Sequence, residues 1–188
     1  MKSMSMLRSS VLAAVALGIA AGGAGAATTL DNLQAAFNGE SNAHAKYLLF
    51  AKKAQDEGYL KVATLFKAAA RAEEIHAGNH AEVIKKMGGV PKADVKAAEV
   101  KTTSENLKAA IEGETYEHDK MYADFLKQAR AEKNVRAIRT FNFAREVEAG
   151  HAKLYGQALA NLESWKAAGT LYVCPECGNT VTSLDFKK

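Results

Sequence analysis

Apolar and polar positions recur with helical spacing over four long segments of the chain. Within each segment, apolar side chains return every three or four residues, which is the pattern of an amphipathic helix with one buried face. The predicted helices span residues 28–56, 60–87, 102–131 and 135–168. The chain from residue 28 to residue 168 is therefore expected to form one all-α domain.

The predicted helices end where turn and capping residues occur. Gly58 closes the first helix, Gly88-Gly89 followed by Pro91 closes the second, and Gly169 closes the fourth. Thr102 and Glu105 match a capping box at the start of the third helix. The stretch 90–101 is the one long connection between helices. Short, long and short connections predict an antiparallel four-helix bundle with one long crossover, which is the ferritin-like topology.

The two halves of the predicted bundle repeat each other. Gly39-Glu40 and His44 recur 74 positions later as Gly113-Glu114 and His118, and Glu73 and His76 recur 75 positions later as Glu148 and His151. Each helix pair therefore resembles one copy of a single hairpin unit. A pseudo-symmetric bundle of this kind brings equivalent side chains from both halves to its centre.

Acidic residues and histidines occupy positions within the apolar stripes. Five carboxylates and two imidazoles are predicted to enter one core: Glu40, Glu73, His76, Glu114, Glu117, Glu148 and His151. Burying unpaired carboxylates costs several kcal/mol each, so a cluster of like charges requires protons or cations. Two metal ions satisfy this requirement.

The spacing of the two Glu-x-x-His motifs supports metal binding. Residues three apart on a helix lie on one face, so Glu73 with His76, and Glu148 with His151, can each reach one metal centre. Mixed carboxylate and imidazole ligands suit iron or manganese, and the absence of thiolates from the bundle argues against structural zinc. The alternative, exposed helical charges, does not explain two repeat-related copies within apolar stripes.

Composition and charge identify a leader and exclude one class of partner. Lys2 and Arg8 precede an apolar stretch and the small residues 24–26, so residues 1–27 are predicted to be a signal peptide of an exported, periplasmic protein. An uncleaved membrane anchor is the alternative. Without Lys2 and Arg8 the 25 basic residues fall to 23, against 21 acidic residues. This near balance indicates no nucleic-acid partner.

Several motifs together resemble rubrerythrin, a ferritin-like di-iron family. They are Gly39-Glu40, Glu73-Glu-Ile-His76, Gly113-Glu114-Thr-Tyr-Glu117, Glu148-Ala-Gly-His151 and Cys174-Pro-Glu-Cys177. The resemblance implies that the five glutamates and two histidines of the core bind two iron ions, with Glu73 and Glu148 bridging them. It also implies that Glu117 and His76 alternate as ligands with redox state, and that Tyr47 and Tyr122 donate hydrogen bonds to ligand carboxylates.

The other histidines are predicted to have packing or surface roles. His44, His80 and His118 are expected not to bind metal, although His80 lies one turn beyond His76 and could hydrogen-bond to the ligand shell. Ordinary packing is likewise the alternative for Tyr47 and Tyr122.

The segment 169–188 resembles part of a rubredoxin-like module. Cys174 and Cys177 form one half of a tetrahedral Fe or Zn site, and a complete module needs a second pair of thiolates. A truncated sequence or a degenerate knuckle that forms a disulfide is favoured over a site completed by another subunit.

These features predict a non-haem di-iron oxidoreductase that reduces hydrogen peroxide to water in oxidative-stress defence. An external electron donor and a homodimer or larger homo-oligomer are expected from the resemblance. The alternatives are a ferritin-like iron-storage or ferroxidase protein without peroxidase turnover, and a bundle in which metal is purely structural.

Overall fold

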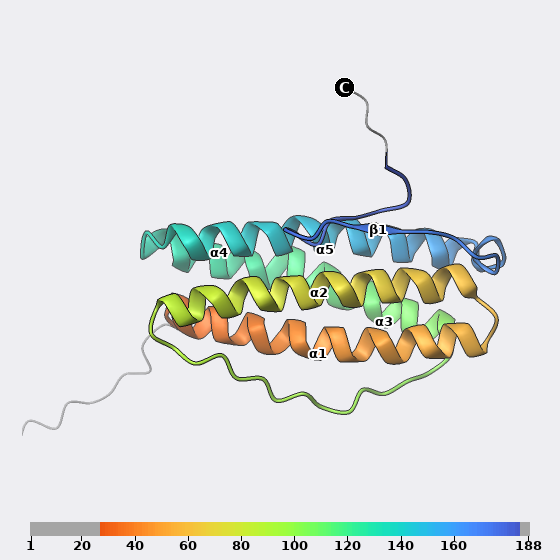
Figure 1. The fold of residues 1–188 in the computed structure, drawn as a ribbon, viewed down its shortest axis with the longest axis horizontal. Coiled ribbons are helices and arrows are strands. Elements are labelled where there is room, and N and C mark those ends of the chain that lie inside the picture. Colours follow the sequence, from red (N-terminus) through yellow and green to blue (C-terminus); the bar gives the residue numbers. More distant parts are fainter. Residues whose placement is uncertain (1–26, 185–188) are drawn as a thin grey trace, which may run out of the picture.

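The computed structural model describes residues 27–184, and most of this range is helical (Figure 1). The predicted signal peptide falls almost wholly outside the described residues. In chain order the elements are α1 (Thr29–Asp56), α2 (Leu60–Lys86), α3 (Thr103–Tyr116), a π-helical turn η1 (Glu117–Met121), α4 (Tyr122–Ala131), α5 (Val135–Ala160), a 3-10 turn η2 (Leu162–Trp165), β1 (Tyr172–Val173) and β2 (Thr180–Val181).

The helix starts and turns predicted from the sequence are confirmed. Thr28 caps α1 in a reciprocal capping box with Asp31, and Thr102 caps α3 in the same way with Glu105. Gly58 and Gly88 have φ angles of +83° and +81°, a region that side chains with a Cβ rarely adopt. These residues end α1 and α2 sharply, so the helices that follow can reverse direction.

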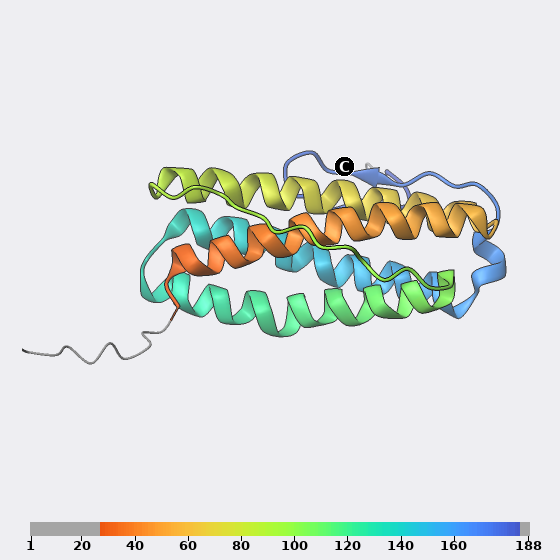
Figure 2. The ribbon, with the colours of Figure 1, turned by 90° about the horizontal axis from the view of Figure 1, so that it is seen from below.

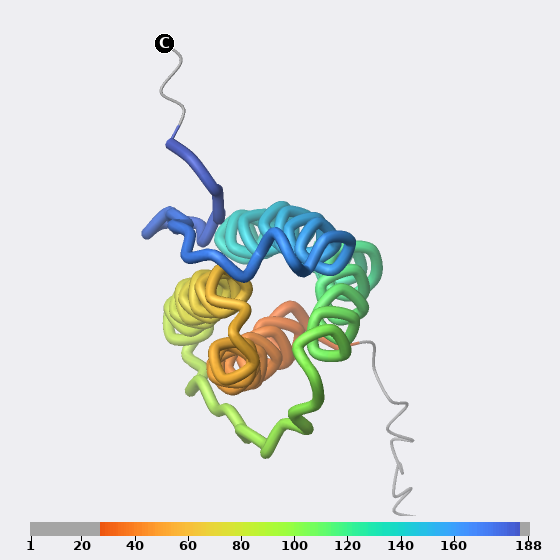
Figure 3. Tube along the Cα trace, turned by 90° about the vertical axis from the view of Figure 1, so that its right-hand side faces the viewer, coloured from red at the N-terminus to blue at the C-terminus, as the bar shows by residue number. Residues whose placement is uncertain are grey.

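The helices form an antiparallel four-helix bundle with one long crossover, as predicted. The irregular segment between α2 and α3 runs along the outside of α1 from one end of the bundle to the other (Figure 2). Viewed along the axis, the helices surround a common centre (Figure 3). In the part of the chain that is described, no helix is both long and apolar enough to cross a membrane.

Two predicted helices differ from the structure. The third is not continuous, because η1 inserts a wider π-helical turn between α3 and α4. The prediction that the fourth helix continues to residue 168 is wrong: α5 ends at Ala160, and Asn161 leaves the helical conformation with φ −145°. The turn η2 then folds back, so that Trp165 is buried in the apolar core.

The core consists of two apolar clusters separated by a polar layer. One cluster includes Tyr47, Phe66 and Tyr155, and the other includes Leu33 and Phe141. On every helix the predicted ligands lie, in chain order, between the residues of one cluster and those of the other. The charged groups are thereby held in the middle of the bundle, where both ends are sealed by close-packed side chains.

The two-stranded segment 172–181 packs against the bundle. Strands β1 and β2 pair antiparallel, with Tyr172 opposite Val181 and Val173 opposite Thr180. The segment contacts α2 and α5, and the end-on view shows it beside these two helices (Figure 3). It therefore covers the side of the bundle at which the two Glu-x-x-His motifs lie.

Candidate metal centre

Six of the seven predicted bundle ligands meet at the centre of the polar layer. Each has 1% or less of its surface exposed, and together they come from α1, α2, α3 and α5: Glu40, Glu73, His76, Glu114, Glu148 and His151. Their donor atoms form two groups, each with all ligand atoms within 4.8 Å of one another. The first group contains Glu40, Glu73, His76 and Glu148, and the second contains Glu73, Glu114, Glu148 and His151.

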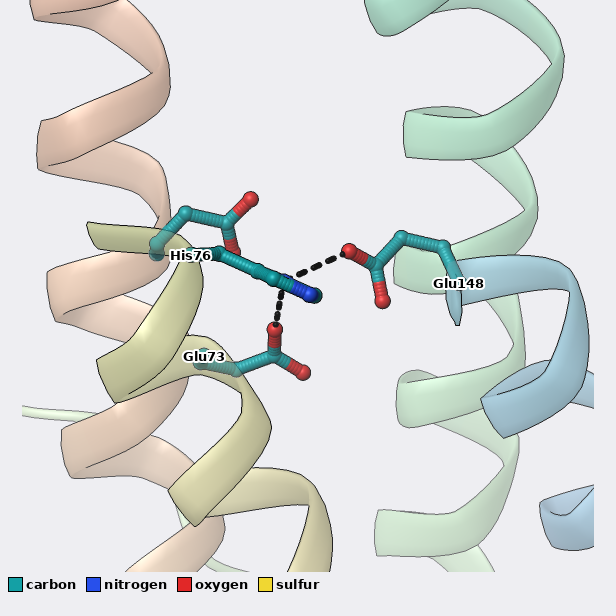
Figure 4. A group of neighbouring side chains, drawn as sticks. Glu73, His76 and Glu148 are labelled. Atoms are coloured by element: carbon teal, nitrogen blue, oxygen red, sulfur yellow. Dashed lines mark hydrogen bonds and ion pairs between the residues drawn. The ribbon is translucent and has the colours of Figure 1, made fainter. Parts of the chain in front are cut away.

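Glu73 and Glu148 belong to both groups, which makes them the candidates for bridging carboxylates. His76 Nδ1 lies 2.9 Å from Glu73 Oε2 and 3.1 Å from Glu148 Oε1 (Figure 4). His151 Nδ1 lies 3.1 Å from Glu148 Oε2 and 3.3 Å from Glu73 Oε1. The pair of glutamates therefore connects two adjacent four-residue sites related by the internal repeat.

The donor set fits two metal ions because it leaves charge and lone pairs unsatisfied. One carboxylate oxygen of each of Glu40, Glu73, Glu114 and Glu148 is buried without a hydrogen-bond partner among the described residues. Buried polar atoms in native proteins are normally paired, since an unpaired one costs about 1–3 kcal/mol and more when charged. Divalent cations would satisfy all four oxygens at once.

Both histidines turn the same nitrogen toward this centre. His76 Nε2 lies 3.0 Å from the carbonyl oxygen of Cys177, which can only accept, so Nε2 carries the proton. His151 Nε2 lies 3.1 Å from Thr180 Oγ1, whose hydroxyl donates to the carbonyl of Gly178. In both rings Nδ1 is then free to bind metal, and the C-terminal segment fixes the ring orientation.

The two predicted tyrosines contact ligand carboxylates. The Tyr47 hydroxyl donates to Glu114 Oε1 at 2.7 Å, and the Tyr122 hydroxyl donates to Glu40 Oε1. Tyr47 and Tyr122 are 75 positions apart, whereas Glu40 and Glu114 are 74 apart. The third helix therefore has one more residue between its glutamate and its tyrosine than the first helix has, and the π-turn η1 contains it. As a result the Tyr122–Glu40 contact is equivalent to the Tyr47–Glu114 contact.

Glu117 is the predicted ligand that lies outside the two groups. It begins the π-helical turn and is half-buried, at one wall of a surface pocket of about 240 Å³ that also includes Asn42 and Lys46. Its role as a ligand stays a prediction. At the end of the π-turn Tyr122 is buried, whereas Met121 is only half-buried.

The cysteine thiols, His44 and His118 lie apart from the centre, whereas His80 Nε2 lies 4.0 Å from Glu40 Oε1. Cys174 and Cys177 are free, half-exposed thiols, and no third donor among the described residues completes a metal group with them. Metal binding by this pair stays a prediction. His44 Nδ1 contacts the carbonyl of Ala70 at 2.7 Å, and His118 contacts the adjacent Asp119.

Sequence reasoning missed the polar residues that support the histidines. Thr180 contacts His151, and Thr140 contacts His80. Asn79 Nδ2 donates to the carbonyl of Glu176 at 2.9 Å and so holds the C-terminal segment on α2. Threonines and asparagines are common on helices and turns, and only the packing of α5 and the C-terminal segment against α2 reveals their partners.

Burial and mutual repulsion shift the ionisation of the carboxyl groups. Burial, reinforced by the charges of Glu73 and Glu148, raises the pKa of Glu114 to about 7 and that of Glu40 well above its usual value. Burial also opposes ionisation of Glu73, but in the metal-free centre its charges raise the pKa of His151 and His76, and the protonated rings donate to it from Nδ1 and lower its pKa to about 2. In the absence of metal the centre therefore retains protons near neutral pH.

Metal affinity is expected to fall as the pH is lowered through about 7. A carboxyl group with a raised pKa is protonated below that pKa, and metal binds the deprotonated form, so metal and proton compete for Glu114. Each displaced proton weakens apparent affinity by about tenfold per pH unit below the pKa. Titration of the metal-free protein with Co²⁺ in a weakly buffered indicator dye should detect released protons. Binding without proton release above and below pH 7 would contradict the predicted protonation.

Gly178→Ala is expected to detach the C-terminal segment from α2. Gly178 has φ +81°, and an added Cβ would lie 2.6 Å from His76 Nε2. The left-handed conformation alone costs a residue with a Cβ about 1–2 kcal/mol. Amide hydrogen exchange in β1 and β2 should accelerate while exchange in α1 stays slow. Gly156→Ala is the control, because no atom lies within 4 Å of the new Cβ, and amide exchange in β1 and β2 should not change in it. Equal protection of β1 and β2 in both variants would show that the segment does not depend on the close approach of Gly178 to His76.

Known families match the chain over most of its length. The family model described as Rubrerythrin matches residues 31–159. Nigerythrin from Nitratidesulfovibrio vulgaris is 38% identical over 162 residues, covering 86% of this chain and 80% of the relative. Rubrerythrin-2 from Clostridium acetobutylicum is 39% identical over 159 residues, covering 82% and 85%.

Solved structures agree with these matches. Nigerythrin in its fully reduced, all-ferrous state superposes with a TM-score of 0.80 at 36% identity, covering 90% of this chain and 84% of that one. A bacterioferritin from Desulfovibrio desulfuricans superposes with a TM-score of 0.66 at 24% identity, covering 85% and 93%, which supports the fold alone. With its fold, paired metal groups and relatives in agreement, the chain belongs to the rubrerythrin family of di-iron proteins.

Proposed function

We propose that this protein is a di-iron peroxidase that reduces hydrogen peroxide to water. The observation that carries the proposal is the pair of four-residue groups that share Glu73 and Glu148. Two iron ions held side by side there would supply two electrons and Lewis acidity to a bound peroxide. The protein residues hold the ions, exclude water and supply protons.

Glu117 is proposed to donate a proton in the reaction. It lies on the side of the centre next to the surface pocket that also includes Asn42 and Lys46. Desolvation, with the negative charges of Glu40 and Glu114, raises the pKa of the Glu117 carboxyl well above its usual value. A carboxyl group with a raised pKa keeps its proton to higher pH and can donate that proton to a departing oxygen. Glu117 lines a surface pocket, and we propose this pocket as the access path for peroxide.

His76 is proposed to alternate with Glu117 as a metal ligand. The two residues approach the centre from different helices, His76 from α2 and Glu117 from the turn after α3. His76 keeps its Nε2 proton on the Cys177 carbonyl at 3.0 Å, so only Nδ1 is offered to metal. A ligand exchange of this kind would couple the geometry of one metal position to its redox state.

The remaining partners follow from the same proposal. An external electron donor restores the reduced state, and a homodimer or larger homo-oligomer is the proposed assembly. The N-terminal sequence supports export to the periplasm, where the protein would defend against peroxide.

Anaerobic iron loading followed by a peroxide titration tests the proposal. Two irons per chain and one peroxide consumed per pair are expected, with a much slower reaction toward oxygen. Glu117→Gln should slow peroxide consumption while retaining iron, and Glu112→Ala, an exposed control on α3, should react normally. Accumulation of many irons per chain, or iron that does not change redox state, would instead support storage or a structural role.

A further inference from the structure

A chain of buried hydrogen bonds connects α5 to the ligand Glu40. Thr140 Oγ1 lies 2.9 Å from His80 Nδ1, His80 Nε2 lies 3.0 Å from the Tyr122 hydroxyl, and that hydroxyl donates to Glu40 Oε1. Glu40, His80 and Tyr122 are fully buried, and Thr140 is 5% exposed. Four side chains from four helices therefore form one continuous path that ends at the metal centre.

The chemistry of the groups sets a single direction for these bonds. A Glu40 carboxylate can only accept, so the Tyr122 hydroxyl donates to it, and the tyrosine oxygen is left to accept from His80 Nε2–H. In a neutral ring Nδ1 then accepts, and the Thr140 hydroxyl donates to it. Every donor points toward Glu40, and aligned bonds of this kind strengthen one another.

The other half of the bundle lacks this path. Residues 75 positions away from His80 and Thr140 are Tyr155 and Leu65. The Tyr155 ring lies beside Tyr47, but its hydroxyl makes no hydrogen bond of normal geometry among residues 27–184, and Leu65 has no polar group to offer it. Tyr47 donates to Glu114 as Tyr122 donates to Glu40, but the groups next to Tyr47 do not continue as a chain of donors. The internal symmetry is broken at His80.

We propose that His80, held by Thr140, is a positioning residue that fixes the Tyr122 hydroxyl on Glu40 and thereby makes the two metal positions unequal. The inference rests on metal binding by the centre and not on peroxide turnover. Both Glu40 and Glu114 accept a hydrogen bond from a tyrosine, but only the bond from Tyr122 is strengthened by a donor chain behind it. Glu40 Oε1 therefore loses more negative charge than Glu114 Oε1, and the metal beside Glu40 and His76 has the weaker donor.

Metal titration of four variants tests this asymmetry. His80→Leu removes the donor to Tyr122. Metal affinity at the position beside Glu40 and His76 should then change by about tenfold, as is typical when a group that orients a ligand is lost. His80→Gln, which can still donate to Tyr122, should restore most of the wild-type affinity. Thr140→Val should have a smaller effect in the same direction. Tyr155→Phe, at the repeat-related position, should change neither position.

Two spectroscopic readouts distinguish positioning from a general loss of structure. In the protein loaded with ⁵⁷Fe, Mössbauer spectra should show two unequal iron environments, of which His80→Leu alters one. In the protein loaded with diamagnetic Zn²⁺, where Glu40 is ionised, ¹⁵N NMR should show His80 protonated at Nε2 and not at Nδ1, with a tautomer mixture in Thr140→Val. Equal changes at both irons, a protonated Nδ1, or wild-type affinity in a folded His80→Leu protein would overturn the proposal. None of these readouts uses peroxide, so failure of the peroxidase test would leave them standing.

Discussion

Glu148→Ala is expected to remove at least one of the two metal ions, and it is the single substitution with the largest expected effect on the centre. Glu148 belongs to both ligand groups, so its loss reduces each from four residues to three. It also removes the carboxylate oxygen 3.1 Å from His76 Nδ1 that helps to orient the ring. A site that loses its shared ligand cannot hold both ions adjacent to one another.

Metal counting after anaerobic loading measures the loss directly, and thermal unfolding measures its consequence. Metal at about a hundred times its Kd stabilises a folded protein by about 2.7 kcal/mol per site, and this increment should shrink or vanish in the variant. Glu146→Ala provides a matched control, because Glu146 lies on the same helix but is exposed. Two bound metals in the Glu148 variant would refute the ligand assignment.

The burial of the candidate ligands could be predicted because few arrangements of a protein core tolerate charged groups. A glutamate such as Glu73, at a helical spacing where its neighbours Ala69 and Phe66 are apolar, must either be neutralised or disrupt the core. The structure places this residue at 0% exposure, as the pattern required. The helix caps were predictable for a similar reason, since Thr28 and Thr102 satisfy backbone groups that would otherwise lack partners.

The end of the fourth helix could not be predicted from local pattern. Residues 161–168 contain good helix formers, and nothing before Gly169 signals a stop. The stop arises from tertiary contacts: the carbonyl of Lys166 accepts from Leu60 N at 3.2 Å, and Lys61 lies over the ring of the buried Trp165. Packing against the start of α2 therefore outweighs helix propensity in this segment.

The position of the C-terminal segment on the bundle could not be predicted from the sequence either. The Cys174–Cys177 motif predicts a metal knuckle, but nothing in it indicates that the Cys177 carbonyl contacts His76. The contact depends on Gly178, whose lack of a Cβ allows the backbone to approach the imidazole. A backbone contact between residues 101 positions apart in sequence leaves no periodic signal.

The π-helical turn, in contrast, did leave a signal. Repeat-related residues are 74 positions apart up to Lys46 and Lys120, and 75 apart from Tyr47 and Tyr122 onward. One residue has therefore been added in the third helix relative to the first, between positions 120 and 122. An α-helix accommodates one added residue as a π-turn without rotating the segments on either side, and such turns are frequent at functional sites.

Deletion of Asp119 is expected to preserve the bundle and its metals while impairing the reaction with peroxide. The deletion shortens the π-turn by one residue and restores the spacing of the first helix between Glu114 and Tyr122, so these residues keep their contacts with Tyr47 and Glu40. Asp119 is itself exposed. Since a regular α-helix has better hydrogen bonding than a π-turn, thermal stability should be unchanged or higher.

The expected loss is confined to Glu117, the first residue of the π-turn. Straightening the turn changes how Glu117 is presented beside the pocket, and a misplacement of about 1 Å in a reacting group can cost about a hundredfold in rate. Stopped-flow mixing of the reduced, iron-loaded protein with peroxide measures this rate. Asp119→Ala, which keeps the number of residues in the turn, should react as the wild type does. If the deletion variant reacted normally, Glu117 would not need the π-turn; if it failed to fold, the flanking helices would not share the register that the internal repeat assigns to them.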